Sequence, residues 1–134
     1  MTYLSVNWLA VILAAAVAWA FGAGWYMVLA RPWLAAIGKT PEEIDRSDYT
    51  PYLWSVLCVL LMAYFVALLT PLITGAMTPL NGIVVGAHLW LGFVITGMVL
   101  NHRYEGKSWT LTAINGGYLL AVLLIEGAII GLFG

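Results

Sequence analysis

Two ionisable side chains, His88 and Glu126, lie inside apolar stretches long enough to cross a membrane. A charge at membrane depth costs at least about 2.5–3.5 kcal/mol, and residues that carry one are usually functional. We therefore consider Glu126 a candidate proton- or cation-binding group, with His88, Asn81 and Asn115 as polar companions. The alternative is a neutral Glu126 that hydrogen-bonds a neighbouring helix purely for structure. The residue types leave both alternatives open.

The positions of His88 and Glu126 would allow the two side chains to meet. At 1.5 Å per residue, His88 lies about 13 Å from the nearer end of a helix over 79–100. Glu126 lies about 12 Å from the corresponding end of a helix over 109–133. Because these helices are consecutive and antiparallel, we expect them to be neighbours, with the two side chains within about one turn. Contact would favour an ion pair and isolation a neutral Glu126, depending on water access.

Other kinds of chemistry have little support. Cys58 is the only cysteine, which excludes an intramolecular disulfide and CxxC redox chemistry. The two histidines, His88 and His102, lack the spacing of a metal site, so we predict no metal and no cofactor. A net charge of −1 provides no concentrated basic face, and we expect no nucleic-acid partner.

The composition predicts the elements that position these residues. Of 134 residues, 63% are hydrophobic and only 8% are charged, whereas a soluble domain carries about 25% charged residues. The solvent must therefore be lipid. Four apolar runs can each cross a hydrocarbon core of about 30 Å. We predict a single all-α integral membrane domain over 1–134, a four-transmembrane-helix bundle with helices over about 3–30, 51–74, 79–100 and 109–133.

The polar loops predict the orientation. All five Lys and Arg residues fall in the expected loops 31–50 and 101–108, which the positive-inside rule places in the cytoplasm. Both termini would then face the periplasmic side of a bacterial inner membrane. The first helix lacks the basic start of a signal peptide, so we expect it to be retained. Expected anchors at the interface and the lipid headgroups are Trp25, Arg31, Trp33, Arg103, Lys107 and Trp109.

Two further features concern the first loop and helix packing. In loop 31–50 we expect a short interfacial helix that ends at Gly38, and then a capping box formed by Thr40 and Glu43. Each of the last two helices carries glycines away from its polar face, which allows close packing where lipid provides no hydrophobic drive. We therefore predict tight helix packing and a homo-oligomer in the lipid bilayer. The expected packing residues are Gly82, Gly86, Gly127 and Gly131.

A resemblance to a known family covers nearly the whole chain. It is carried by Asn-Trp-Leu-Ala-Val (7–11), Gly-Trp-Tyr (24–26), Arg-Pro-Trp (31–33), the loop 38–43, Trp-Leu-Gly-Phe (90–93), Asn101, Glu-Gly-Lys-Ser-Trp (105–109) and Asn-Gly-Gly-Tyr (115–118). In these segments the chain resembles a bacterial four-helix membrane family known as domain of unknown function 1761. The resemblance implies the same architecture and brings no activity. His88 and Glu126 lie outside the segments that carry it.

Three functions compete. The one that we expect is a non-enzymatic, oligomeric packing or binding module, with an unknown small-molecule ligand. The second is a small proton-coupled exporter or channel that uses Glu126 with His88. It resembles the small multidrug transporters in size and helix count, but their essential Glu lies in the first helix, not the last. The third is a lipid- or quinone-linked membrane enzyme that uses interfacial residues, namely Asn101, His102, Arg103 and Trp109.

Overall fold

The computed structural model describes residues 5–134, which contain helices and no strand. The helices are α1 (Trp8–Val28), α2 (Ala30–Ile37), the 3₁₀ turn η1 (Pro41–Glu43), α3 (Thr50–Thr74), α4 (Pro79–Leu89), the π-helical turn η2 (Trp90–Val94), α5 (Ile95–Tyr104) and α6 (Trp109–Phe133). α4, η2 and α5 follow one another without a break and form one rod. Within the described residues, four helical rods of 21 to 26 residues are long and apolar enough to cross a membrane. The predicted all-α, four-span fold is confirmed, and the chain is a multi-pass membrane protein.

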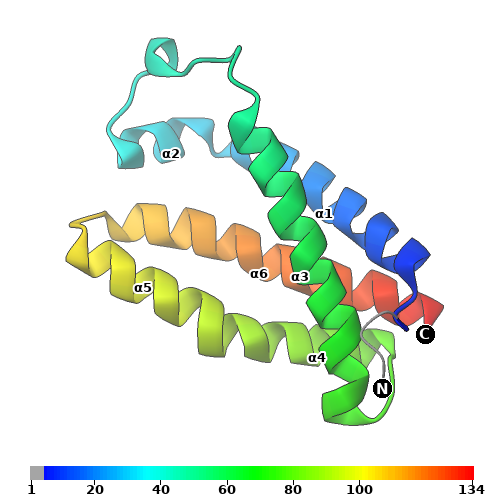
Figure 1. Ribbon diagram of the computed structural model, residues 1–134. Coiled ribbons are helices and arrows are strands. Elements are labelled where there is room, and N and C mark those ends of the chain that lie inside the picture. Colours follow the sequence, from blue (N-terminus) through cyan, green and yellow to red (C-terminus); the bar gives the residue numbers. More distant parts are fainter. Residues whose placement is uncertain (1–4) are drawn as a thin grey trace.

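The helix α6 lies at the centre of the arrangement (Figure 1). It packs against α1 and α3, and runs antiparallel to the rod of α4, η2 and α5. The loop after α2 and the loop before α6 lie at one end of the bundle (Figure 1). We call this the charged end, because it holds every Asp, Glu, Lys and Arg of residues 5–134 except Glu126. The turn between α3 and α4 and the C-terminus lie at the opposite end.

Short polar residues and glycines define the helix ends. Asn7, Thr78 and Ser108 begin α1, α4 and α6, and each side-chain oxygen accepts a backbone N–H of the first turn at 3.1 to 3.2 Å. These bonds satisfy donors that a helix leaves free at its start. Gly38 ends α2 with φ +74° and Gly75 ends α3 with φ +90°, a conformation that glycine adopts without strain. The interfacial helix thus ends where the sequence predicts.

Two helix boundaries differ from the prediction. α1 begins at Trp8, and the predicted start near residue 3 lies outside the described residues. The third rod continues past its predicted end at residue 100 to Tyr104, so the loop shrinks to 105–108. The reason is that His102 and Arg103 remain helical and hydrogen-bond a threonine of α6. A sequence pattern based on polarity alone places these two residues in the loop.

Small residues bring the backbones together at the centre and at the uncharged end. The side chains of Ala10, Ala14, Ala18 and Ala63 are fully buried in the core between α1 and α3. Between α4 and α6 glycines do the same, and these contacts fix the antiparallel register of the pair. Because side chains are absent there, α6 and α4 approach more closely than two larger residues would allow.

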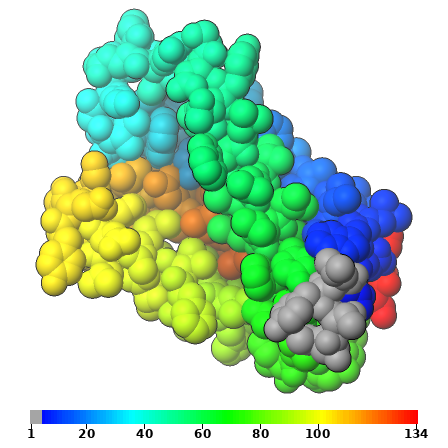
Figure 2. All heavy atoms as spheres, viewed as in Figure 1, coloured from blue at the N-terminus to red at the C-terminus, as the bar shows by residue number. Residues whose placement is uncertain are grey.

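Toward the charged end the helices separate. α3 packs against α4 but diverges from α5, so that α6 is visible between them (Figures 1 and 2). The rod of α4 and α5 is also interrupted by η2, where one extra residue per turn changes the directions of the side chains that follow. The sequence predicted a continuous α-helix there. Divergence and interruption together shape the candidate site.

Candidate functional site

The structure does not bring His88 and Glu126 together. The His88 ring is exposed on the outer side of α4, and its Nδ1 lies 2.7 Å from the carbonyl oxygen of Val84 in the same helix. Glu126 is fully buried, and neither of its carboxyl oxygens has a hydrogen-bond partner among residues 5–134. The two residues therefore lie on opposite sides of the α4–α6 contact.

The register of α4 against α6 explains this separation. Gly82 contacts Gly127, and Gly86 lies opposite Leu123, so each step along α4 is matched by a step back along α6. Continuing this pairing places Glu126 level with residue 83, about 7.5 Å along the axis from His88 at 1.5 Å per residue. The sequence estimate measured the depths of His88 and Glu126 from the ends of their own helices and assumed that these ends are level. In the structure the C-terminal end of α6 extends beyond the start of α4, which shifts Glu126 relative to His88.

Glu126 lies in an apolar part of the core. Val122 and Ile130, one turn away on either side, are buried on the same face of α6. The buried core cluster on this face consists of alanine, valine, leucine and isoleucine from α1, α3 and α6, and the partly buried Tyr64 and Tyr118 pack against it. An unpaired charge in such surroundings would carry a large desolvation cost. The Glu126 carboxyl group is therefore buried in the core without a hydrogen-bond partner among residues 5–134.

The two predicted asparagine companions have separate structural roles. Asn81 donates from Nδ2 to the carbonyl oxygen of Ala76 at 3.1 Å, which holds the turn before α4. Asn115 accepts a hydrogen bond from the Tyr26 hydroxyl at 2.7 Å, three turns along α6 from Glu126. The four predicted site residues are thus divided among the turn, the outer face of α4, the core and the α1–α6 contact. Their role in ligand binding stays a prediction.

Aromatic side chains from other helices hydrogen-bond three consecutive residues of α6. The Trp25 indole N–H donates to the carbonyl oxygen of Ile114 at 3.0 Å. The Trp90 indole N–H donates to that of Gly116 at 2.8 Å, and the Tyr26 hydroxyl to Asn115. Trp25 therefore uses its polar atom inside the bundle, although its position near a helix end predicted an interfacial anchor. Trp90 and Tyr26 stood out in the sequence only as parts of motifs shared with the family, and no pattern predicted their hydrogen bonds to α6.

The remaining predicted anchors surround a basic corner at the charged end. The Arg103 guanidinium stacks on Trp109, 3.7 Å from the ring centroid, and its Nη2 donates to the Lys107 carbonyl oxygen and to Thr112 Oγ1, both at 3.0 Å. His102 Nδ1 lies 2.7 Å from the same Thr112 oxygen. Arg103 Nε is buried, with no partner in the part of the chain that the structure describes. Thr112 is thus the centre of a cluster that connects α5 to α6, and no sequence pattern predicted this role.

The other interfacial residues lie apart from this corner. Asn101, which the enzyme hypothesis groups with His102, is exposed and separate from the Thr112 cluster. Trp33 of α2 packs edge-on against Tyr26, with 5.7 Å between the two ring centroids. Arg31 is exposed. Within residues 5–134, none of the five Lys and Arg side chains forms an ion pair. The charged end therefore presents free positive charge.

The loop between α2 and α3 adds fixed negative charge at the same end. The Ser47 hydroxyl and N–H donate to Asp45 Oδ1 at 2.6 and 2.9 Å, and these bonds lower the pKa of the Asp45 carboxyl. The Thr50 N–H, at 3.0 Å, lowers the pKa of Asp48. Both groups are fully exposed and form local turns at the start of α3. The capping box also forms, since the Thr40 N–H donates to Glu43 Oε1 at 3.3 Å.

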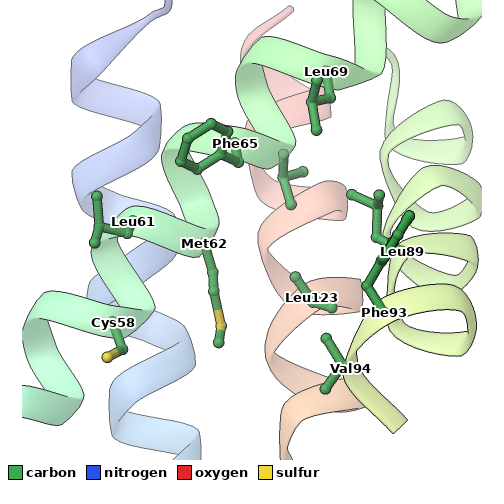
Figure 3. Close-up of a pocket in the computed structure, with 10 residues that line it drawn as sticks. Cys58, Leu61, Met62, Phe65, Leu69, Leu89, Phe93, Val94 and Leu123 are labelled. Atoms are coloured by element: carbon green, nitrogen blue, oxygen red, sulfur yellow. The ribbon is translucent and has the colours of Figure 1, made fainter. Parts of the chain in front are cut away.

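An apolar groove opens where α3 leaves the rod of α4 and α5. Its volume is about 390 Å³. Figure 3 shows the groove between α3, which carries Met62 and Phe65, and the rod that carries Leu89 and Phe93, with Leu123 of α6 between the two. The lining consists of hydrophobic side chains, so the groove can hold hydrocarbon and offers no hydrogen bond for a polar group. No sequence pattern predicted it, because it depends on the angle between α3 and α5.

The comparisons with known proteins identify a family without adding an activity. Residues 9–131 match the family described as "Protein of unknown function (DUF1761)". No curated protein matches the chain. No solved structure matches it either.

Proposed function

Because the chain belongs to the DUF1761 family of proteins of unknown function, we propose its role from its geometry. The role is that of a non-catalytic, homo-oligomeric binding module of a bacterial inner membrane, with both termini on the periplasmic side. Its ligand is an anionic phospholipid, whose hydrocarbon chain lies in the groove between α3 and η2. The observation that carries this proposal is the groove itself, which is apolar and lies beside α6.

The basic residues support the orientation and offer contacts to an anionic headgroup, although the same end also carries five acidic residues. Arg31, Lys39 and Arg46 lie near the loop after α2, and Arg103 and Lys107 lie near the loop before α6. None of these five is neutralised by an ion pair within the described residues. Each basic residue near an anionic membrane surface contributes about 1 kcal/mol of attraction. Their shared position at one end supports a cytoplasmic charged end.

The use of the polar side chains supports binding rather than catalysis. Trp25, Tyr26 and Trp90 each donate a side-chain hydrogen bond to α6. His102 and Arg103 both hydrogen-bond the hydroxyl oxygen of Thr112. These bonds connect helices to one another and leave few polar groups directed at a bound molecule. Hydrogen bonds of this kind stabilise a membrane bundle by about 0.6 kcal/mol each. The groove is the part of the molecule that remains open for a ligand.

Native mass spectrometry of the protein released from mild detergent tests the proposal. The protein is mixed with phosphatidylglycerol or with phosphatidylethanolamine. We expect one retained phosphatidylglycerol per chain, lost in Leu61→Trp, whose larger side chain fills the groove. Leu53→Trp, on the same helix but outside the groove lining, should retain the lipid. Equal retention in both variants, or no preference for the anionic lipid, would refute the proposed ligand.

A proton-linked exporter or channel is the second candidate, and Glu126 favours it. A fully buried carboxyl group without a partner in the described residues is unusual in a membrane bundle and often functional. Under this candidate, Glu126→Gln should fold normally and abolish proton flux into protein-containing vesicles. Wild-type vesicles that show no flux above empty vesicles would remove it.

A further inference from the structure

A second groove lies along α5 and ends at an arginine. Its volume is about 480 Å³. All of its lining belongs to α5, in the rod that is least enclosed by the rest of the bundle. The lining residues are Ile95, Thr96, Val99, Leu100, Arg103 and Tyr104. This second groove therefore joins apolar surface to a positive charge, whereas the groove between α3 and η2 has a hydrophobic lining.

The Arg103 guanidinium is held in place at the end of the second groove. It stacks on the Trp109 ring, 3.7 Å from the centroid, and its Nη2 donates to the Lys107 carbonyl oxygen and to Thr112 Oγ1. Arg103 is half-buried, whereas the other four Lys and Arg side chains are exposed. A side chain that is already ordered loses less conformational freedom when it binds. Arg103 is therefore the basic residue that is best prepared to hold an anion.

The same guanidinium keeps an unused charge and an unused donor. Nη1 forms no hydrogen bond within residues 5–134, and Nε is buried, so Nη1 is the nitrogen open to a ligand. No carboxylate of the described residues forms an ion pair with Arg103, and the exposed Glu105 near it in the sequence is no exception. A guanidinium binds phosphate through strong, charge-assisted hydrogen bonds. A phosphate group at Nη1 therefore supplies a partner that these residues do not.

The two grooves follow one another along the third rod at the length of a lipid chain. The rod contributes Leu89, Phe93 and Val94 to the groove beside α3, and the second groove begins at Ile95. From Phe93 to Arg103 the rod rises about 15 Å, at 1.5 Å per residue. One leaflet, half of a hydrocarbon core of about 30 Å, has the same thickness. A lipid whose phosphate lies at Arg103 therefore has chains long enough to reach the groove beside α3.

We propose that Arg103 holds the phosphate of the anionic phospholipid whose chains lie in the two grooves, and that Arg103 sets the preference for an anionic headgroup. This inference rests on the proposed function, because it assigns the headgroup contact of the same ligand. Phosphatidylethanolamine also has a phosphate, but its own ammonium group offsets the charge, so Arg103 favours phosphatidylglycerol. A free phosphate ion uses the guanidinium alone and leaves the apolar lining uncovered. The apolar lining therefore points to a lipid.

Removal of the charge tests the headgroup contact. Native mass spectrometry in mild detergent, with equal amounts of phosphatidylglycerol and phosphatidylethanolamine, gives the ratio of the two retained lipids. We expect Arg103→Gln to lower this ratio about tenfold, because hydrogen bonds to charged groups are the strong ones. Arg31→Gln removes an exposed charge at the same end, outside both grooves, and should change the ratio less than twofold. Equal changes in the two variants would overturn the role of Arg103.

A substitution that leaves Arg103 intact provides a second readout. Leu100→Trp fills the second groove and should reduce the retained lipid about tenfold, whereas Leu80→Trp, exposed on the same rod outside both linings, should not. Equal retention in these two variants would overturn the inference even if Arg103→Gln does not fold. Displacement of the lipid by glycerol 3-phosphate, which has the phosphate without the chains, would also overturn it.

The failure of this inference and that of the proposed function give different results. A wild-type protein that retains no lipid would overturn both. Loss of the lipid in Leu61→Trp, with an unchanged lipid ratio in Arg103→Gln, would overturn the headgroup contact alone and leave the groove beside α3 as the binding site.

Discussion

The helix α6 is held in two different ways along its length. Near the C-terminus its backbone contacts that of α4, because Gly127 and Gly82 leave no side chains between them. In its first half, three consecutive residues are bonded by the aromatic side chains of Trp25, Tyr26 and Trp90. The glycine contact requires that no side chain lies between the two backbones. The aromatic contacts require particular hydrogen-bond donors that span a wider gap between the helices.

This difference locates the adaptable part of the molecule. Backbone contact between glycines leaves no room for an added atom, since a Cβ would meet the facing backbone and push the two helices apart. Side-chain hydrogen bonds span a distance and leave more room between the rods. The groove between α3 and η2 lies at the boundary of the two halves, because its α6 residue is Leu123, opposite Gly86. We therefore assign rigidity to the glycine-packed half and ligand binding to the region where that packing ends.

Gly82→Ala should give the largest effect. An added Cβ would collide with the carbonyl group of Gly127, which has no flexible end that can move aside. We expect a loss of about 3 kcal/mol in the free energy of unfolding, at the upper end of typical overpacking costs. Unfolding in mild detergent, measured by steric trapping, checks the value.

The same substitution at Gly24 provides the control for Gly82→Ala. Because a Cβ at Gly24 meets nothing within 4 Å, Gly24→Ala should be neutral or stabilising by roughly 0.5–1 kcal/mol. If both variants lose the same stability, the cost belongs to helix formation in general and the glycine contact has no special role.

Glu126→Leu should have an intermediate effect of opposite sign. Leucine has a similar size and removes two buried oxygens that lack partners in the described residues. Leaving such groups unpaired costs about 1–3 kcal/mol. We therefore expect the free energy of unfolding of the variant to increase by about 1 kcal/mol or more. The same steric-trapping measurement applies. A destabilised variant would mean that the carboxyl group has a partner of real value, such as a bound proton donor or ion, and would strengthen the proton-linked candidate.

Much of the fold could be predicted from the sequence. Four apolar runs set the number of spans, and the all-α membrane fold is confirmed. Capping residues such as Thr78 and Ser108, followed by apolar runs, fixed two helix starts closely. The third rod was predicted too short because Asn101 to Tyr104 are polar, and polarity indicates water exposure rather than the end of a helix. Family membership was also correctly inferred from short motifs.

The site was less predictable, because it depends on angles and register. Helical periodicity places His88 and Glu126 on faces of their own helices, but it does not state which face meets which neighbour. The glycine contacts set that register, and a shift of a few residues separates the pair. The π-turn and the divergence of α3 from α5 leave no mark in hydropathy, so neither the Trp90 hydrogen bond to α6 nor the groove was predicted.

Trp90→Phe should have the smallest effect and tests the hydrogen-bonded half of α6. It removes the indole N–H that donates to the Gly116 carbonyl oxygen at 2.8 Å, while keeping an aromatic ring. Interhelical hydrogen bonds in membranes average about 0.6 kcal/mol, so we expect a loss of that order. Trp54→Phe removes the same atoms from an exposed tryptophan and should leave stability unchanged. Equal losses at Trp54 and Trp90 would show that this hydrogen bond contributes nothing beyond the aromatic ring. In that case the Trp90 contact with α6 would be one of ring packing, and the bonds of Trp25 and Tyr26 would remain as the polar contacts of this half.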